Sequence, residues 1–164
     1  MNKLLVVSLA TLVALVSTTA AQAAGVVQVR FVEPQNFTDV RDGSYLLDQN
    51  LRSLERVVIH AAAPHVADGQ TLTIDITDVD LAGYIHPGAM PRAVRVLRGG
   101  ADWPRITLRW RLEGAAPRSG EAVVQDLDYQ SRFAPAQGAT GLTYEKRMLQ
   151  DYFRSQFDGG AAAH

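Results

Sequence analysis

Residues Arg105–Leu112 read R-I-T-L-R-W-R-L, and apolar residues alternate with polar ones through the whole stretch. Successive side chains of a strand point to opposite faces, so the apolar residues share one face and the polar residues take the other. The apolar residues are Ile106, Leu108, Trp110 and Leu112. Because a strand buried on both faces would be apolar throughout, this alternation predicts a sheet that is covered on one side only.

Other segments of the chain carry a similar strand pattern. Val26–Val32 reads V-V-Q-V-R-F-V, and Gln70–Asp80 reads Q-T-L-T-I-D-I-T-D-V-D. Glu113-Gly114 and the run Pro117–Gly120 predict a hairpin into a further strand, Glu121–Tyr129. We also expect a short edge strand at Ala93–Leu97, inside a loop rich in glycine and proline.

Two segments carry the helical period. Between Ser44 and Ala63 apolar residues recur every three or four positions, and Pro64 limits the end of this helix. Thr143–Phe157 has the same spacing, with Glu145 in the first turn, where a negative charge is favourable. The order strand, helix, strands, helix predicts an α+β fold: a two-layer sandwich in which a mostly antiparallel sheet carries two helices on one face.

The N-terminus has the pattern of an export signal. A basic start is followed by the uncharged stretch Leu4–Val16 and then by Ala21-Gln22-Ala23, the small-x-small sequence that a signal peptidase reads. A membrane-spanning helix needs about 20 apolar residues, more than this stretch offers. We therefore expect a signal peptide over residues 1–23, cleaved after Ala23.

Composition narrows the class of protein. The 164 residues include no cysteine, which excludes a cysteine-ligated metal centre, a disulfide scaffold, a cysteine nucleophile and a lipid anchor at the cleavage site. Sixteen Lys+Arg against seventeen Asp+Glu argue against a nucleic-acid partner bound by bulk positive charge. We expect a single domain over residues 24–158 and a flexible tail over 159–164. The prediction includes no cofactor and no membrane anchor after cleavage.

The carboxylates of Asp75, Asp78 and Asp80 form the densest acidic group in the sequence. By strict alternation Asp78 and Asp80 fall on the apolar face of their strand, so the strand must end, bulge or supply partners there. One interpretation is structural, with these residues capping a turn or pairing with arginines. The other is a divalent-cation site with Asp78, Asp80 and His86 as ligands.

Two further groups are candidates for function. Arg105, Arg109 and Arg111 could bind phosphate or a polyanion, or they could pair with acidic residues on a solvated sheet face. Asp126 and Asp128 could act as a carboxylate pair, although two carboxylates on one strand are more often solvated or salt-bridged. No Gly-x-Ser-x-Gly motif and no zinc-type histidine spacing occurs, so catalytic residues stay unassigned.

Several blocks of the sequence resemble one bacterial family, the domain-of-unknown-function family 3016 (DUF3016). The blocks are Phe37-Thr38-Asp39, Asp68-Gly69-Gln70-Thr71-Leu72, Asp78-Val79-Asp80-Leu81-Ala82-Gly83, Trp103-Pro104-Arg105-Ile106, Asp126-Leu127-Asp128-Tyr129 and Tyr144-Glu145-Lys146-Arg147-Met148-Leu149. The resemblance spans Val27 to Phe157 and implies a small exported, periplasmic protein of Gram-negative bacteria. It implies no activity, substrate or site residues.

Three functional hypotheses follow. The preferred one is a non-catalytic periplasmic module that binds an envelope protein or a small ligand. The second is a metal-dependent hydrolase built on the aspartate group. The third is an anion or polysaccharide binder that uses the three arginines.

Overall fold

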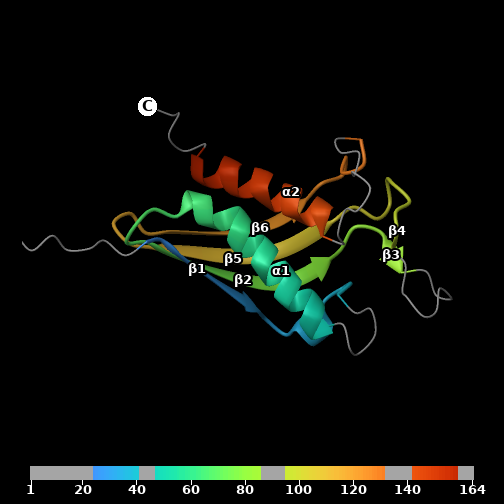
Figure 1. Cartoon of the computed structure of the whole chain (residues 1–164), viewed down its shortest axis with the longest axis horizontal. Helices are drawn as coiled ribbons and strands as arrows, with labels where there is room; N and C mark the ends of the chain where they lie inside the picture. Colours follow the sequence, from blue (N-terminus) through green and yellow to red (C-terminus); the bar gives the residue numbers. More distant parts are fainter. Residues whose placement is uncertain (1–23, 41–46, 86–94, 132–141, 159–164) are drawn as a thin grey trace, which may run out of the picture.

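A computed structural model describes residues 24–40, 47–85, 95–131 and 142–158 (Figure 1). The strands are β1 (Val26–Phe31), β2 (Thr71–Asp80), β3 (Tyr84–Ile85), β4 (Arg95–Val96), β5 (Arg105–Glu113) and β6 (Arg118–Gln125). The helices are α1 (Leu47–Ala62) and α2 (Thr143–Phe153), with 3₁₀ turns at Pro34–Asn36 and Ala63–His65 and a π-helical turn at Arg154–Asp158. The predicted signal peptide, residues 1–23, and the predicted tail, residues 159–164, lie outside the described residues.

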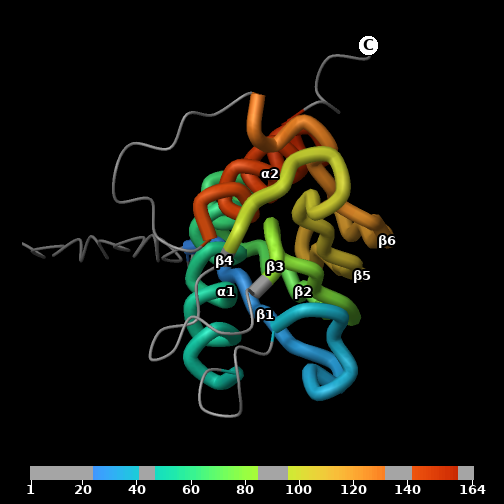
Figure 2. Tube along the Cα trace, turned by 90° about the vertical axis from the view of Figure 1, so that its right-hand side faces the viewer, coloured from blue at the N-terminus to red at the C-terminus, as the bar shows by residue number. Residues whose placement is uncertain are grey.

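The main sheet has the strand order β1-β2-β5-β6. β1 runs parallel to β2, and the other two ladders are antiparallel. Both helices lie on the same face of this sheet, as the two views show (Figures 1 and 2). The predicted α+β arrangement, a mostly antiparallel sheet with two helices on one face, is therefore confirmed.

The core lies between the sheet and the two helices. The four apolar residues of β5 that the alternation selected are all at most 5% exposed, and so are Leu72, Ile74 and Ile76 of β2. From the helices, Leu54 and Val58 of α1 and the apolar side of α2 pack against them. The opposite face of the sheet carries no helix among the described elements (Figure 2). Polar side chains on this face, among them Gln28, Arg30 and Arg109, are exposed. Neither described helix has the length and apolar character to cross a membrane.

Element boundaries differ from the prediction mainly in β6. The strand begins at Arg118 rather than Glu121, because the turn that contains Gly114 is complete by residue 117. It ends at Gln125 rather than Tyr129, because Asp126 and Asp128 form a turn. The helix predicted to start at Ser44 is α1. It is described from Leu47 onward, because residues 41–46 lie outside the described part. α2 gives way to the π-helical turn after residue 153.

The strand expected at Ala93–Leu97 is present as β4, and it pairs with β3 in a small separate sheet instead of forming an edge of the main one.

A β-bulge in β2 explains the acidic residues that broke its alternation. The register with β5 runs from Ile76 opposite Leu108 directly to Asp78 opposite Thr107, so Thr77 is the extra residue. An extra residue reverses the facing of everything after it. Val79 therefore takes the core face, where it is fully buried, and Asp78 points to the open face of the sheet.

Candidate functional site

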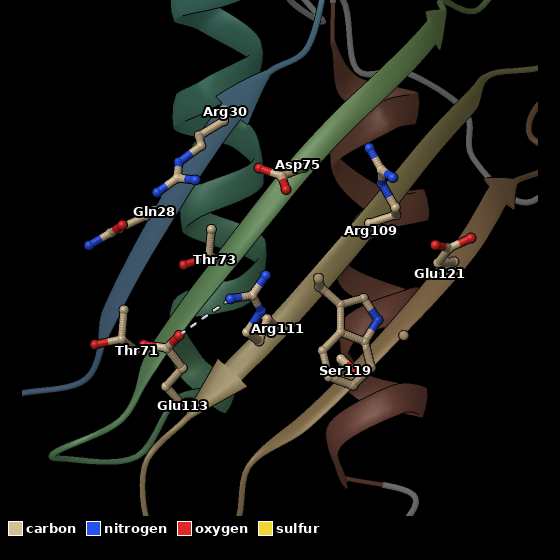
Figure 3. Close-up of a pocket in the computed structure, with 12 residues that line it drawn as sticks. Gln28, Arg30, Thr71, Thr73, Asp75, Arg109, Arg111, Glu113, Ser119 and Glu121 are labelled. Carbon is tan, nitrogen blue, oxygen red and sulfur yellow. Dashed lines mark ion pairs between the residues drawn. The ribbon is translucent and has the colours of Figure 1, made fainter.

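The open face of the sheet, opposite the helices, holds a hollow of about 650 Å³ (Figure 3). Residues of all four strands line it: Gln28 and Arg30 from β1, Thr71, Thr73 and Asp75 from β2, Arg109, Trp110, Arg111 and Glu113 from β5, and Ser119, Gly120 and Glu121 from β6. The lining carries three arginines and three carboxylates, together with several amide and hydroxyl groups. The hollow is therefore a polar surface with balanced charge.

Four of these residues form a row that crosses the whole sheet, which we call the charge row. Arg30 pairs with Asp75 in the register of β1 and β2, Asp75 pairs with Arg109, and Arg109 pairs with Glu121. The charges thus alternate in sign from one edge of the sheet to the other, as Figure 3 shows. Within the described part of the chain, no ion pair within 4.0 Å joins any two members of the row.

A second row lies on the same face, two residues along each strand from the charge row. It consists of Gln28, Thr73, Arg111 and Ser119, which are neighbours in the same three ladders. The guanidinium of Arg111 is 3.8 Å from a carboxylate oxygen of Glu113, and both side chains are largely exposed (Figure 3). Together the two rows offer guanidinium, amide and hydroxyl donors beside carboxylate acceptors.

The three candidate arginines of the anion hypothesis divide between two places. Arg109 and Arg111 line the hollow, whereas Arg105 lies further along β5, where its guanidinium is 3.1 Å from a carboxylate oxygen of Asp80. Arg30 completes the charge row, and the sequence analysis did not select it. A single arginine in an alternating strand gives no signal until the pairing of β1 with β2 is known.

The candidate metal ligands already have partners within the chain. Asp78 accepts two hydrogen bonds from Thr38, one from the backbone N–H at 2.8 Å and one from the hydroxyl at 3.0 Å. Asp80 forms the ion pair with Arg105. His86 lies outside the described residues, and within those that are described no three His, Asp or Glu side chains are grouped to hold a metal ion. The metal site stays a prediction.

The second candidate carboxylate pair belongs to the turn after β6. One carboxylate oxygen of Asp126 accepts the backbone N–H of Asp128 at 3.1 Å, and Asp128 in turn accepts the hydroxyl of Ser131. These are the local hydrogen bonds with which aspartate stabilises turns. They account for both residues without a catalytic role.

A network of polar groups around the buried Tyr129 lies at the end of the sheet where β5 begins. Tyr129 is 2% exposed and donates its hydroxyl to Asp102 at 2.8 Å, and Asp102 also accepts the backbone N–H of Arg98. Burial, together with the neighbouring carboxylate, raises the pKa of Tyr129 to about 12. Burial alone would raise the pKa of Asp102, but the hydrogen bonds that its carboxylate accepts outweigh it and lower the pKa.

Glu145 of α2 joins another part of the chain to this end of the sheet. Its side chain is 1% exposed, and its Oε1 accepts the backbone N–H of Ala82 at 2.8 Å. Ala82 lies two residues after the end of β2 and is itself buried. The first turn of α2 is thereby attached to the segment that leaves the central strand.

The sequence matches the model of a known protein family. The model of a family described as a protein of unknown function (DUF3016) matches residues 25–155. The chain belongs to the DUF3016 family. No curated protein and no solved structure matches it. The match covers all the described strands and both helices, so the fold described above is that of the DUF3016 domain.

The blocks that carry the resemblance to DUF3016 meet at one end of the fold. Thr38 contacts Asp78, and the backbone N–H of Asp39 donates to the carbonyl of Val79. The block that begins at Tyr144 reaches the Asp-x-Asp-Leu-Ala-Gly block through Glu145, and the ring of Tyr144 lies 4.9 Å from that of Tyr129. Five of the six blocks are thus in mutual contact and fix the structure at this end. The hollow on the open face draws most of its lining from outside them.

Proposed function

We propose that this DUF3016 protein is an exported, non-catalytic binding module whose binding surface is the hollow on the open face of the sheet. The charge row is the observation that carries the proposal. Arg30, Asp75, Arg109 and Glu121 follow one another across four described strands, and no ion pair within 4.0 Å joins them. Their donors and acceptors are therefore available for charge-assisted hydrogen bonds to another molecule.

The charge row favours a ligand that carries both signs of charge. Neighbouring strands are about 4.8 Å apart, so the row spans about 14 Å, the length of about four residues of extended peptide. A ligand with one sign of charge would gain from two members of the row and be repelled by the other two. A short peptide segment with acidic and basic side chains, as part of an envelope protein or as a small ligand, fits this surface.

The acidic residues outside the hollow support binding over catalysis. Asp78, Asp80, Asp102 and Glu145 each accept a hydrogen bond or an ion pair from another part of the chain, at distances between 2.6 and 3.1 Å. Such contacts fix loops and strand ends and engage at least one oxygen of each carboxylate.

Export is tested by expressing the full chain in a Gram-negative host and releasing the periplasmic contents by osmotic shock. We expect the protein in the released fraction, with the mass of a chain that begins at Ala24. Recovery of the intact 164-residue chain from the cytoplasm would contradict the export part of the proposal.

Binding is tested with three synthetic octapeptides: alternating Glu and Lys, all Glu, and all Lys. We expect the alternating peptide to bind most tightly in fluorescence polarisation. Substituting Arg109→Ala should weaken that binding about tenfold, because a charge-assisted hydrogen bond is lost. Arg52→Ala, at an exposed position on α1, is the matched control and should leave binding unchanged.

Two results would overturn the proposal. One is equal binding of the three peptides, or no binding at all, in the wild-type protein. The other is turnover of ester, phosphate, peptide or glycoside substrates by the purified protein, because that activity would make it an enzyme.

A further inference from the structure

β6 is an edge of the main sheet with no neighbour on its outer side. It pairs with β5 only, and among the described residues no strand or loop forms backbone hydrogen bonds with its other edge. A free edge presents a row of unpaired N–H and C=O groups that can bind another strand. Proteins usually blunt such edges with prolines, bulges, very short strands or charged side chains. The eight residues of β6 contain no proline and two charged residues, Arg118 and Glu121, and Val123 on the open face is 56% exposed.

We propose that β6 pairs antiparallel with β6 of a second copy of this chain. The two-fold axis passes through the pair formed by Ala122 and its counterpart. The result is a continuous eight-stranded sheet with all four helices on the same side. This inference concerns the edge of the sheet and does not rest on the proposed ligand surface.

Two requirements determine the register of this pairing between the two β6 strands: the helices of both copies lie on one side of the sheet, and no like charges lie opposite each other. Directly opposite residues of an antiparallel pair point to the same face, so helices on one side require the axis to pass through a residue. An axis through Glu121 would set two like charges opposite each other, which is unfavourable. An axis through Val123 would pair only residues 121–125. An axis through Ala122 pairs residues 119–125 and sets Arg118 of each copy opposite Asp126 of the other.

The space beside β6 suits the incoming charge. A groove of about 420 Å³ runs between β6 and α2, and its lining includes Asp126, Asp151 and Tyr152. Arg118 projects to the same helix side of the sheet, where its guanidinium lies 5.1 Å from the ring centre of Phe157. Across the two-fold axis, each Arg118 would therefore enter the partner's groove and meet the carboxylate of Asp126 and, beside it, that of Asp151, which also pairs with Arg147 and Arg154 of its own chain. Both ends of the interface gain this contact, because a two-fold interface is self-complementary.

The register with its axis through Ala122 is also compatible with the charges on the open face of the sheet. Each Glu121 lies opposite Val123 of the other copy and keeps Arg109 of its own chain as its neighbour on β5. The two Val123 side chains occupy diagonal positions across the seam, so each is covered on the side that is exposed in the single chain. No two like charges face each other directly.

Cysteine cross-linking tests the register, because the chain contains no cysteine of its own. In periplasmic protein purified after expression of the full chain, Ala122→Cys should give a disulfide-linked dimer under mild oxidation. Val123→Cys should cross-link at least tenfold more slowly, and Val26→Cys, which is 45% exposed on the opposite edge of the sheet, should stay monomeric. Equal cross-linking of the three variants, or faster cross-linking of Val123→Cys, would overturn the proposed register.

A charge swap tests the pairing without any covalent bond. We expect the wild-type protein to shift from monomer to dimer with concentration in analytical ultracentrifugation. Arg118→Asp alone, or Asp126→Arg alone, should raise the dissociation constant at least tenfold. The double variant Arg118→Asp/Asp126→Arg should restore it to within about threefold of the wild-type value. A wild-type protein that stays monomeric up to millimolar concentration, or a double variant no better than either single one, would overturn the proposal.

Discussion

Glu145 is the buried charged residue of the described structure, and its contact with Ala82 ties α2 to the end of β2. Glu145→Ala would leave the buried N–H of Ala82 without this acceptor, and a cavity would replace the side chain. We expect the free energy of unfolding to fall by about 2–4 kcal/mol. Urea denaturation at pH 7 measures this change.

Two further variants serve as comparisons for the Glu145→Ala prediction. Glu145→Gln keeps an acceptor oxygen of similar size and should lose less stability than the alanine variant. Lys146→Ala removes an exposed neighbour on the same helix and should change the free energy of unfolding by less than about 0.5 kcal/mol. Equal losses for Glu145→Ala and Lys146→Ala would show that the hydrogen bond to Ala82 contributes nothing to stability.

Tyr129 gives the protein a pH-dependent contribution to stability on the alkaline side. Its pKa is raised to about 12 in the folded state, against 10.0 for an unperturbed tyrosine. Ionisation between these values therefore favours the unfolded chain. The contribution is fully present below pH 10 and is lost as the pH rises toward 12.

Tyr129→Phe tests this contribution. At pH 7 the variant should be less stable than the wild type by about 1–2 kcal/mol, because Asp102 loses a hydrogen-bond donor. Between pH 10 and 12 its urea midpoint should decline less steeply than that of the wild type. Some decline persists, since burial also raises the pKa of Tyr152. Parallel midpoint curves for the two proteins across this range would contradict the prediction.

The bulge in β2 determines the facing of the residues that follow it. Deleting Thr77 would remove the extra residue, so that Asp78 would follow Ile76 directly in the pairing with β5 and Asp78 and Val79 would keep their present faces. We therefore expect the deleted chain to fold, with a loss of about 1–2 kcal/mol in the free energy of unfolding because the hydrogen bond from the Thr77 hydroxyl to the Thr107 carbonyl is lost. Circular dichroism and urea titration test this outcome. Deleting Thr73 instead would turn the apolar residues on one side of the deletion to the open face, and that variant should not fold.

Local sequence predicted most elements but misjudged those whose limits depend on distant contacts. The alternation in β2 and β5 gave both strands to within one residue, because their facing follows from the pattern alone. In β6, Ser119 and Gly120 read as turn residues. The structure pairs Gly120 with Trp110, and a Cβ at this glycine would lie 2.9 Å from the indole ring. The strand includes the glycine because the tryptophan needs that space.

The candidate site was predictable only in part, because it depends on how strands that are distant in the sequence pair with one another. Arg109 and Arg111 were selected from one strand, and pairing with acidic residues on a solvated sheet face was one interpretation of them. The charge row depends on the registers of three separate ladders, one of them the parallel pairing of β1, which brings Arg30 beside Asp75. No local pattern contains these registers, because they arise when distant segments pack on a common core.

The balance of charge on the open face determines what the whole molecule attracts. Because the hollow carries as many carboxylates as arginines, a polyanion should gain little from it. We expect the wild-type protein to pass through heparin–agarose without retention in 50 mM salt. Asp75→Asn/Glu121→Gln removes the two negative members of the charge row and leaves two arginines. That variant should be retained and should elute as the salt concentration rises, because salt screens the attraction.

The comparison needs a control with the same change in net charge placed elsewhere. Asp48→Asn/Glu55→Gln makes that change on α1, on the far side of the sheet, and should pass through the column almost as the wild type does. Retention of the control would mean that net charge, not the open face, governs binding. Retention of the wild type would favour the hypothesis of an anion or polysaccharide binder and would contradict a ligand of mixed charge, because a balanced row cannot select one sign.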